Sequence, residues 1–185
     1  MKYSKPIQIN SWEQLSEKYA SYVSYSHDGL AAKIIDKSDY EFIESIICPT
    51  LESMSGLKHT IAYAILFFSK PNSRRGLHID YDSGQGNYSV KNAWALNIPI
   101  LNCQDSEMEW YYGDYTSERH ESKTTLPSYR LVWKSEPKLA ESVKILEPTL
   151  VYIDQPHDVI NHSSEHRIMM SIRTYPNILT FNPNV

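Results

Sequence analysis

The pattern of apolar and polar positions changes near residue 57 of the chain. Before that point, "SWEQLSEKYASYVS" (11–24) and "SDYEFIESII" (38–47) carry apolar residues at the three- and four-residue spacing of amphipathic helices. Each segment opens with a capping-box pattern, in which two side chains satisfy backbone N–H groups at a helix start. The pairs are Ser11 with Gln14 and Ser38 with Glu41. The pattern predicts two short helices within residues 1–56.

Beyond residue 57 the apolar runs are short and rich in β-branched and aromatic residues, with turn-forming stretches such as "SKPNSRRG" and "DSGQGN" between them. The predicted strands are "HTIAYAILFF", "GLHIDY", "NAWALNIPIL", "MEWYYG", "SYRLVW", "TLVYID" and "RIMMSIRTY". Strands that follow one another without helices favour an antiparallel sandwich or barrel. The segment "PKLAESVKI" (137–145) is either a short helix or a connection.

These patterns predict one mainly β domain over residues 1–185. A helical segment (1–56) packs on one sheet of a β core (57–175), and a tail (176–185) follows. A length of 185 residues suits a single domain.

Composition narrows the possible partners and the setting. A net charge of −4, with no basic run longer than "SRR", argues against a nucleic-acid surface. The two cysteines form no CxxC motif and suggest a reducing, cytoplasmic environment. The most apolar run (60–69) is too short to cross a bilayer, and the N-terminus lacks the apolar stretch of a signal peptide. We therefore expect a soluble cytoplasmic protein that acts without a membrane or nucleic acid.

The segment "GLHIDYDSGQG" (76–86) places His78 and Asp80 two residues apart. In an extended strand these side chains share one face, with Ile79 on the other. An imidazole and a carboxylate on one face are either a hydrogen-bonded structural pair or part of a metal site. Non-haem iron sites use two histidines and one carboxylate and leave the remaining coordination positions open. The second interpretation therefore needs another histidine.

The segment "TLVYIDQPHDVINHSSEHRIMMSIR" (149–173) supplies candidates for that ligand. His157 follows the apolar run and a proline, at a strand end, and Arg167 comes ten residues later on the next predicted strand. His162 and Arg173 have a similar spacing and are the alternatives. We favour His157, because His162 lies within a polar turn. An arginine at this point can form a bidentate pair with a carboxylate.

These residues resemble the pattern of the Fe(II)- and 2-oxoglutarate-dependent oxygenases: H-x-D, a long interval, then His and, about ten residues on, Arg. The match consists of "HID" (78–80), "PHDVINHSSEHR" (156–167) and "ALNIPI" (95–100), which looks like the strand that often follows H-x-D. The resemblance covers about residues 57–175. It implies a double-stranded β-helix, the jelly-roll barrel of that family.

The resemblance also implies roles for individual residues. His78, Asp80 and His157 would hold Fe(II) and form the catalytic site, and Arg167 would bind the distal carboxylate of 2-oxoglutarate. Many members place Ser or Thr two residues beyond the arginine, where this chain has Met169. Ser171, on the same strand face, is a possible substitute for that hydroxyl.

Further residues have open interpretations. Arg173 is either a second cosubstrate contact or an exposed charge, and Asn97 lines either a ligand space or a packed sheet interface. The segment 107–123 forms either a strand with a lid or an ordinary exposed loop. The His-Asp pairs at 27–28 and 157–158 resemble those of metal phosphohydrolases, but the helical residues of that fold are missing.

The expected activity is hydroxylation, with molecular oxygen, of a C–H bond in a small polar metabolite, a free amino acid or a protein side chain. The alternatives are a cupin-like metalloprotein that does not use 2-oxoglutarate and a non-enzymatic jelly-roll binding module. The oligomeric state is not predicted.

Overall fold

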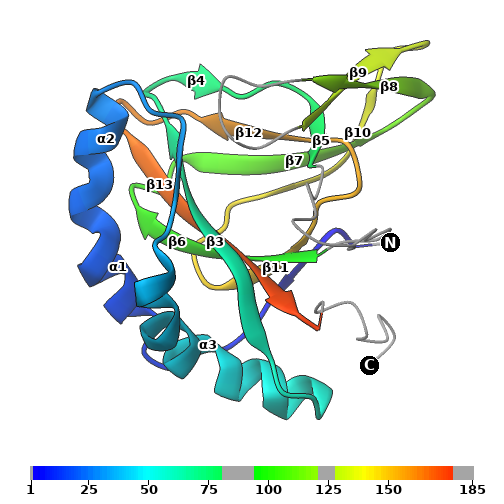
Figure 1. Cartoon of the computed structure of the whole chain (residues 1–185). Helices are drawn as coiled ribbons and strands as arrows, with labels where there is room; N and C mark the ends of the chain where they lie inside the picture. Colours follow the sequence, from blue (N-terminus) through cyan, green and yellow to red (C-terminus); the bar gives the residue numbers. More distant parts are fainter. Residues whose placement is uncertain (1, 81–93, 121–127, 177–185) are drawn as a thin grey trace.

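Two antiparallel β-sheets face each other in the computed structural model, which describes residues 2–80, 94–120 and 128–176 (Figure 1). The larger sheet by residue count has the strand order β1-β11-β6-β13-β3-β2. Its strands are β1 (Ser4–Pro6), β2 (Ala32–Ile34), β3 (Thr60–Ser69), β6 (Trp94–Leu101), β11 (Thr149–Tyr152) and β13 (Arg167–Tyr175). β3 and β13 are the longest strands and pair along most of their length. We call this the helix-covered sheet.

The second sheet has the strand order β10-β7-β12-β5-β9-β8, with β4 paired to β12. Its strands are β4 (Ser73–Arg74), β5 (His78–Asp80), β7 (Ser106–Tyr112), β8 (Tyr115–His120), β9 (Ser128–Trp133), β10 (Lys138–Val143) and β12 (His157–Asn161). Two facing antiparallel sheets with this mainly β content form a jelly roll. The predicted fold class, a double-stranded β-helix with short helices on one sheet, is confirmed.

The helices lie on the outer face of the helix-covered sheet (Figure 1). They are α1 (Glu13–Tyr19), η1 (Ala20–Tyr22), α2 (Val23–His27), η2 (Lys37–Asp39) and α3 (Tyr40–Ser55). α3 buries Ile43, Ile47 and Leu51, which recur every four residues and so share one face. Within the described ranges, no helix has the length and apolar character needed to cross a bilayer.

The predicted capping boxes are wrong at both helix starts. Ser11 has a positive φ of 61°, and its backbone carbonyl, not its side chain, accepts from Gln14 N. At the second start, the Asp36 carboxylate accepts the Ser38 N–H at 3.0 Å, and α3 begins only at Tyr40. Asp36 accepts within its own local turn, so Ser38 does not serve as the cap.

Short strands account for the other differences from the predicted elements. Residues 138–143 form β10, an edge strand, and not a helix or a connection. Most of its side chains are exposed, so no apolar alternation marked it as a strand. β1, β2, β4, β8 and β12 were also not predicted. The segment 1–56 therefore contributes two strands to the helix-covered sheet in addition to its helices.

β13 separates two different environments. Ile168, Met170 and Ile172 pack with the helices in the larger apolar core. The odd-numbered residues from Arg167 to Arg173 lie on the opposite face, toward the second sheet. Because side chains alternate along a strand, one strand here supplies apolar residues to the core and polar residues to the space between the sheets.

Candidate metal centre

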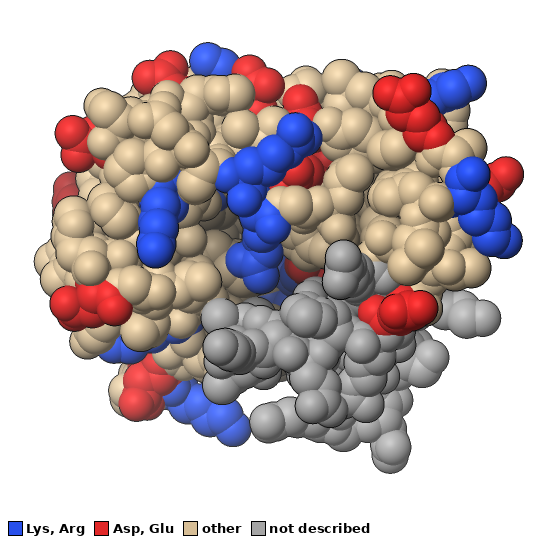
Figure 2. Space-filling model, turned by 90° about the horizontal axis from the view of Figure 1, so that it is seen from above, with Lys and Arg blue, Asp and Glu red and all other residues tan. Residues whose placement is uncertain are grey.

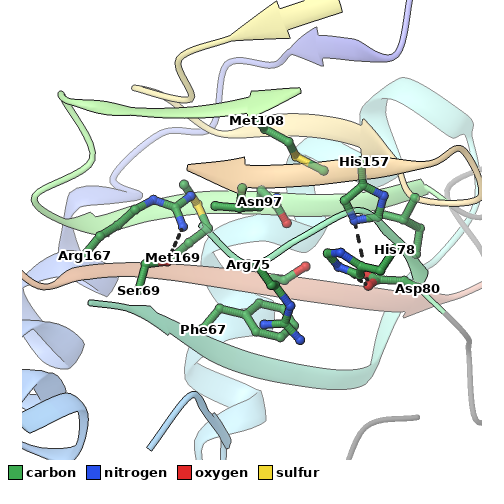
Figure 3. A pocket seen from close by; sticks show the side chains of 13 residues that line it. Phe67, Ser69, Arg75, His78, Asp80, Asn97, Met108, His157, Arg167 and Met169 are labelled. Atoms are coloured by element: carbon green, nitrogen blue, oxygen red, sulfur yellow. Dashed lines mark hydrogen bonds and ion pairs between the residues drawn. The ribbon is translucent and has the colours of Figure 1, made fainter. Parts of the chain in front are cut away.

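The structure brings His78, Asp80 and His157 together between the sheets (Figure 3). β5 and β12 are antiparallel neighbours in which His157 pairs with His78, so their rings lie side by side with centres 4.4 Å apart. Asp80 is on the same face of β5 as His78. Its Oδ1 atom lies 3.4 Å from Nε2 of His78 and 3.8 Å from Nε2 of His157. All three potential ligand atoms lie within 4.8 Å of one another.

Backbone carbonyls orient both imidazole rings. Nδ1 of His78 lies 2.8 Å from the Gly76 carbonyl oxygen, and Nδ1 of His157 lies 2.9 Å from that of Gln155. A carbonyl oxygen only accepts hydrogen bonds, so Nδ1 is the protonated nitrogen in each ring. In the uncharged form of each ring, the lone pair of Nε2 therefore faces Asp80. Metal-binding histidines are commonly oriented in this way.

With both rings uncharged, the site places three electron-pair donors close together, and a cation shared by them would remove their mutual repulsion. A proton on His157 is a poor candidate for that cation. Burial, with the proximity of His78 in support, lowers the pKa of His157 to about 4 despite the opposing effect of Asp80. At neutral pH the ring is therefore uncharged. This donor set fits a divalent transition metal bound by two imidazoles and one carboxylate.

Asp80 is held in its ionised form by its surroundings. Burial acts to raise its pKa, but the interactions of its carboxylate with His78, His157 and Arg173 have the larger combined effect. The pKa of Asp80 is therefore below its ordinary value. An ionised carboxylate is the form that a metal ion requires.

Arg173 is part of this site, which the sequence did not establish. Its Nη2 atom donates to Oδ2 of Asp80 at 3.0 Å, and its Nη1 atom donates to Oγ of Ser171 at 2.7 Å. Arg173 is only 5% exposed, so it is not the surface charge that one interpretation allowed. The sequence suggested that the hydroxyl of Ser171 contacts the cosubstrate. In the structure Ser171 lines the pocket, and its hydroxyl accepts a hydrogen bond from Arg173.

A pocket that is open to solvent extends from the three residues to Arg167, and its empty space, with the solvent at its mouth included, is about 460 Å³. Figure 3 shows Arg167 at one side of this pocket and the His–Asp–His cluster at the other, with Asn97 between them. Met108 and Met169 provide apolar surface. The buried Oδ1 atom of Asn97 has no hydrogen-bond partner among the described residues. Asn97 therefore lines ligand space and not only a packed sheet interface.

Arg167 is a buried cation that pairs with no carboxylate in the described part of the chain; the thiol of Cys103 is its neighbour. Arg167 is 3% exposed, and none of the described carboxylates forms an ion pair with it. Its Nη1 atom makes a long bond of 3.4 Å to Oγ of Ser69, and its Nε has no described partner. Burial lowers the pKa of its guanidinium. An unpaired buried charge is costly, so this position fits the binding of an anionic ligand.

Ser69 was not predicted as a site residue. It lies opposite Arg167 in the pairing of β3 with β13, so the hydroxyl next to the arginine comes from the neighbouring strand and not from position 169. No local sequence signal identifies such a cross-strand contact. Only the strand register reveals it.

The structure also decides between several alternatives. His162 is exposed and its backbone N–H bonds the Asp105 carbonyl, so it is outside the pocket. Asp158 faces away from the cluster and binds Arg74 and the Gly76 N–H. In the segment 107–123, residues up to Tyr112 belong to β7 and residues 115–120 to β8; residues 121–123 lie outside the described residues.

Comparisons with known proteins agree with this fold. No protein-family model matches the chain, and no curated protein is significantly similar to it in sequence. Among solved structures, AviO1 from Streptomyces viridochromogenes Tue57 is similar with a TM-score of 0.50 at 11% identity, over 90% of this chain and 85% of AviO1. SnoK, a non-heme alpha-ketoglutarate-dependent carbocyclase from nogalamycin biosynthesis, is similar with a TM-score of 0.50 at 12% identity, over 91% of this chain and 77% of SnoK. At these identities the likeness shows a shared fold. In fold, the resemblance to the 2-oxoglutarate-dependent oxygenases is confirmed.

Proposed function

We propose that the protein is an Fe(II)- and 2-oxoglutarate-dependent dioxygenase that hydroxylates a C–H bond of a small polar metabolite, a free amino acid or a protein side chain. The observation that carries the proposal is the pairing of two features in one pocket. One is a cluster of three side chains whose potential metal-ligating atoms lie within 4.8 Å of one another, and the other is a buried arginine with no acidic partner among the described residues.

The roles of the residues follow from their positions. His78, Asp80 and His157 hold the metal through Nε2, Oδ1 and Nε2, while Gly76 and Gln155 keep both rings oriented. Arg167 binds the distal carboxylate of 2-oxoglutarate as a planar, charge-assisted pair, with Ser69 beside it. Met108 and Met169 exclude water from the space between. A site loaded in this way supplies oxidative chemistry in which 2-oxoglutarate and O₂ yield succinate and carbon dioxide, and the second oxygen atom enters the substrate.

An anaerobic titration tests this proposal without knowledge of the substrate. Fe(II) is added to the metal-free protein, 2-oxoglutarate follows, and the weak visible charge-transfer band of the chelate is recorded. We expect the band in the parent protein and in the His162→Ala variant, which removes an exposed histidine. We expect no band in His157→Ala because a ligand is lost. Arg167→Met should bind Fe(II) normally but need at least tenfold more 2-oxoglutarate for the same band.

Other outcomes would support the alternatives. Metal binding by the parent protein without a response to 2-oxoglutarate would favour a cupin-like metalloprotein. If neither the parent protein nor His157→Ala bound Fe(II), the result would favour a binding module without catalysis. Succinate formation in air, without added substrate, would add support for the dioxygenase.

A further inference from the structure

We propose that Arg75 binds a carboxylate of the substrate, so the protein acts on a small carboxylic acid and not on a neutral molecule. This inference rests on the proposed function. It concerns a residue that the metal site and the cosubstrate site leave unused.

Arg75 lies at the pocket on the side of the candidate metal centre (Figure 3). It follows β4 directly and comes three residues before His78, and its backbone N–H bonds the Val159 carbonyl at 3.0 Å. Its guanidinium lies over the ring of Phe67, with 4.9 Å between the central carbon and the ring centre. Stacking on a ring holds a guanidinium by its face and leaves the N–H groups at its edge available.

The side chain of Arg75 has no ion pair or hydrogen bond among the described residues, although it is beside an arginine that has several. Arg74 bonds Asp158 at 2.5 Å and Glu109 at 3.1 Å, so that residue serves the structure of β4 and its neighbours. Arg75 is an exposed side chain that lines the pocket and lies over the ring of Phe67. Its donors are thus unassigned at the place where a substrate approaches the metal.

The charges that line the pocket favour a further anion. Three arginines and one carboxylate line or adjoin it: Arg75, Arg167, Arg173 and Asp80. Arg173 is paired with Asp80, and Arg167 is assigned to the distal carboxylate of the cosubstrate. With a divalent metal also present, Asp80 and the two carboxylates of 2-oxoglutarate do not balance all the positive charges at the pocket. Among the described residues Arg75 has no anionic partner, and a carboxylate matches its donor geometry.

The surface around the pocket agrees with an anionic substrate. Figure 2 looks down on the side of the molecule that carries β4 and shows Lys and Arg side chains in a band at the middle of this face, with Asp and Glu side chains next to them. Positive potential at a cleft attracts anions and raises their rate of encounter.

Matched pairs of compounds test the proposal. The probes are the free L-amino acids and short 2-hydroxy acids, each compared with its primary amide, which has nearly the same shape but no negative charge. Each probe is added to the anaerobic complex with Fe(II) and 2-oxoglutarate, and binding is measured by calorimetry. Succinate formation in air is measured in parallel. We expect at least one acid to bind and to stimulate succinate formation, with its amide at least tenfold weaker.

Three variants assign the effect to Arg75. Arg75→Gln should weaken binding of that acid at least tenfold and remove the preference over the amide. Arg75→Lys should retain part of the preference for the acid over its amide, because lysine keeps the positive charge but lacks the planar pair of N–H donors of a guanidinium. Lys134→Gln, which removes an exposed positive charge elsewhere, should behave as the parent protein. The dissociation constant of 2-oxoglutarate should stay within twofold of the parent value in Arg75→Gln.

Two results would overturn the inference. One is a panel in which no acid binds more tightly than its amide. The other is a loss of 2-oxoglutarate affinity in Arg75→Gln as large as in Arg167→Met, which would assign Arg75 to the cosubstrate. Both are distinct from failure of the proposed function, since that failure is the absence of the charge-transfer band in the parent protein. In that case, calorimetry of the same pairs with the metal-free protein still decides whether Arg75 selects carboxylates.

Discussion

Arg173 binds one oxygen of Asp80 while the other oxygen faces two histidines. The Nη2 to Oδ2 distance is 3.0 Å, and Oδ1 lies 3.4 Å and 3.8 Å from the two imidazole Nε2 atoms. The arginine therefore fixes the rotation of the carboxylate and leaves a single oxygen for a metal. This arrangement favours monodentate binding and preserves open coordination positions for other ligands.

We predict that Arg173→Gln weakens Fe(II) binding by about 10- to 100-fold, the range found when partners of metal ligands are removed. Asp80 would lose the donor that sets its orientation. Arg173→Lys should recover part of the affinity, because a cation remains near Oδ2 of Asp80. The measurement is an anaerobic metal titration with a competing chelator. Equal affinities in the parent and Arg173→Gln, with both proteins folded by circular dichroism, would contradict this role.

We predict that Arg167→Met stabilises the metal-free protein while it removes 2-oxoglutarate binding. Burial of Arg167 without a described carboxylate partner is unfavourable, and methionine is apolar and of similar length. Residues kept for function at the expense of stability typically allow gains of about 0.5–2 kcal/mol on replacement. Urea unfolding without ligands measures the change. A clear decrease in stability would mean that Arg167 has a structural role.

We predict that Asp158→Asn lowers both stability and metal affinity, although Asp158 does not face the metal centre. Its carboxylate accepts from the Gly76 N–H at 2.8 Å and from Arg74 at 2.5 Å, and the Gly76 carbonyl in turn orients His78. Loss of a buried charged hydrogen bond costs about 1.5–3 kcal/mol.

The matched control for Asp158 is Glu109→Gln, which removes the other carboxylate on Arg74. We expect this variant to keep the metal affinity of the parent protein, because Glu109 does not bind Gly76. Thermal unfolding and the metal titration are measured on both. If both variants lost metal affinity equally, Arg74 and not the Gly76 peptide would connect Asp158 to His78.

We predict that His59 makes the protein less stable in acid. Burial lowers its pKa, against smaller opposing effects of the Pro176 carbonyl and Glu52, so the folded state binds a proton less readily than the unfolded chain. Above about pH 6.5, His59 is uncharged in both states and does not reduce the free energy of unfolding. As the pH decreases through that value, the free energy of unfolding falls by at most about 1.4 kcal/mol per pH unit.

The difference in unfolding free energy between the parent protein and His59→Gln isolates this effect, because the other histidines contribute equally to both. We expect the parent to lose more stability than the variant between pH 7 and pH 5. Parallel curves for the two proteins would show that His59 does not titrate differently on folding.

The sequence predicted those parts of the site that depend on residue type and strand alternation. His78 and Asp80 share a face because they are two apart in a strand, and an arginine ten residues after His157 faces the same space from the next strand along the chain. Strands with apolar runs, such as β3 and β13, were recognised because burial on both faces leaves a clear pattern. The fold class followed from those strands and the absence of helices between them.

Contacts between distant strands could not be predicted. The Arg173–Asp80 pair and the Ser69–Arg167 contact join residues more than 90 positions apart, and they depend on which strands are neighbours and in what register. The predicted cap at the second helix start was wrong for a local reason. The Asp36 side chain accepts the N–H of Ser38 in a turn that precedes the helix. β10 was not predicted as a strand because an exposed edge strand has no buried face and therefore no alternation of apolar and polar residues.

β13 has a consequence for how the activity can change. Its even-numbered residues from Ile168 to Ile172 pack in the helical core, and its odd-numbered residues from Arg167 to Arg173 line or adjoin the pocket. Insertion or deletion of one residue would exchange the two sets and place arginines among isoleucines. New specificities are therefore expected to arise on the opposite wall and at the rim, while this strand stays constant.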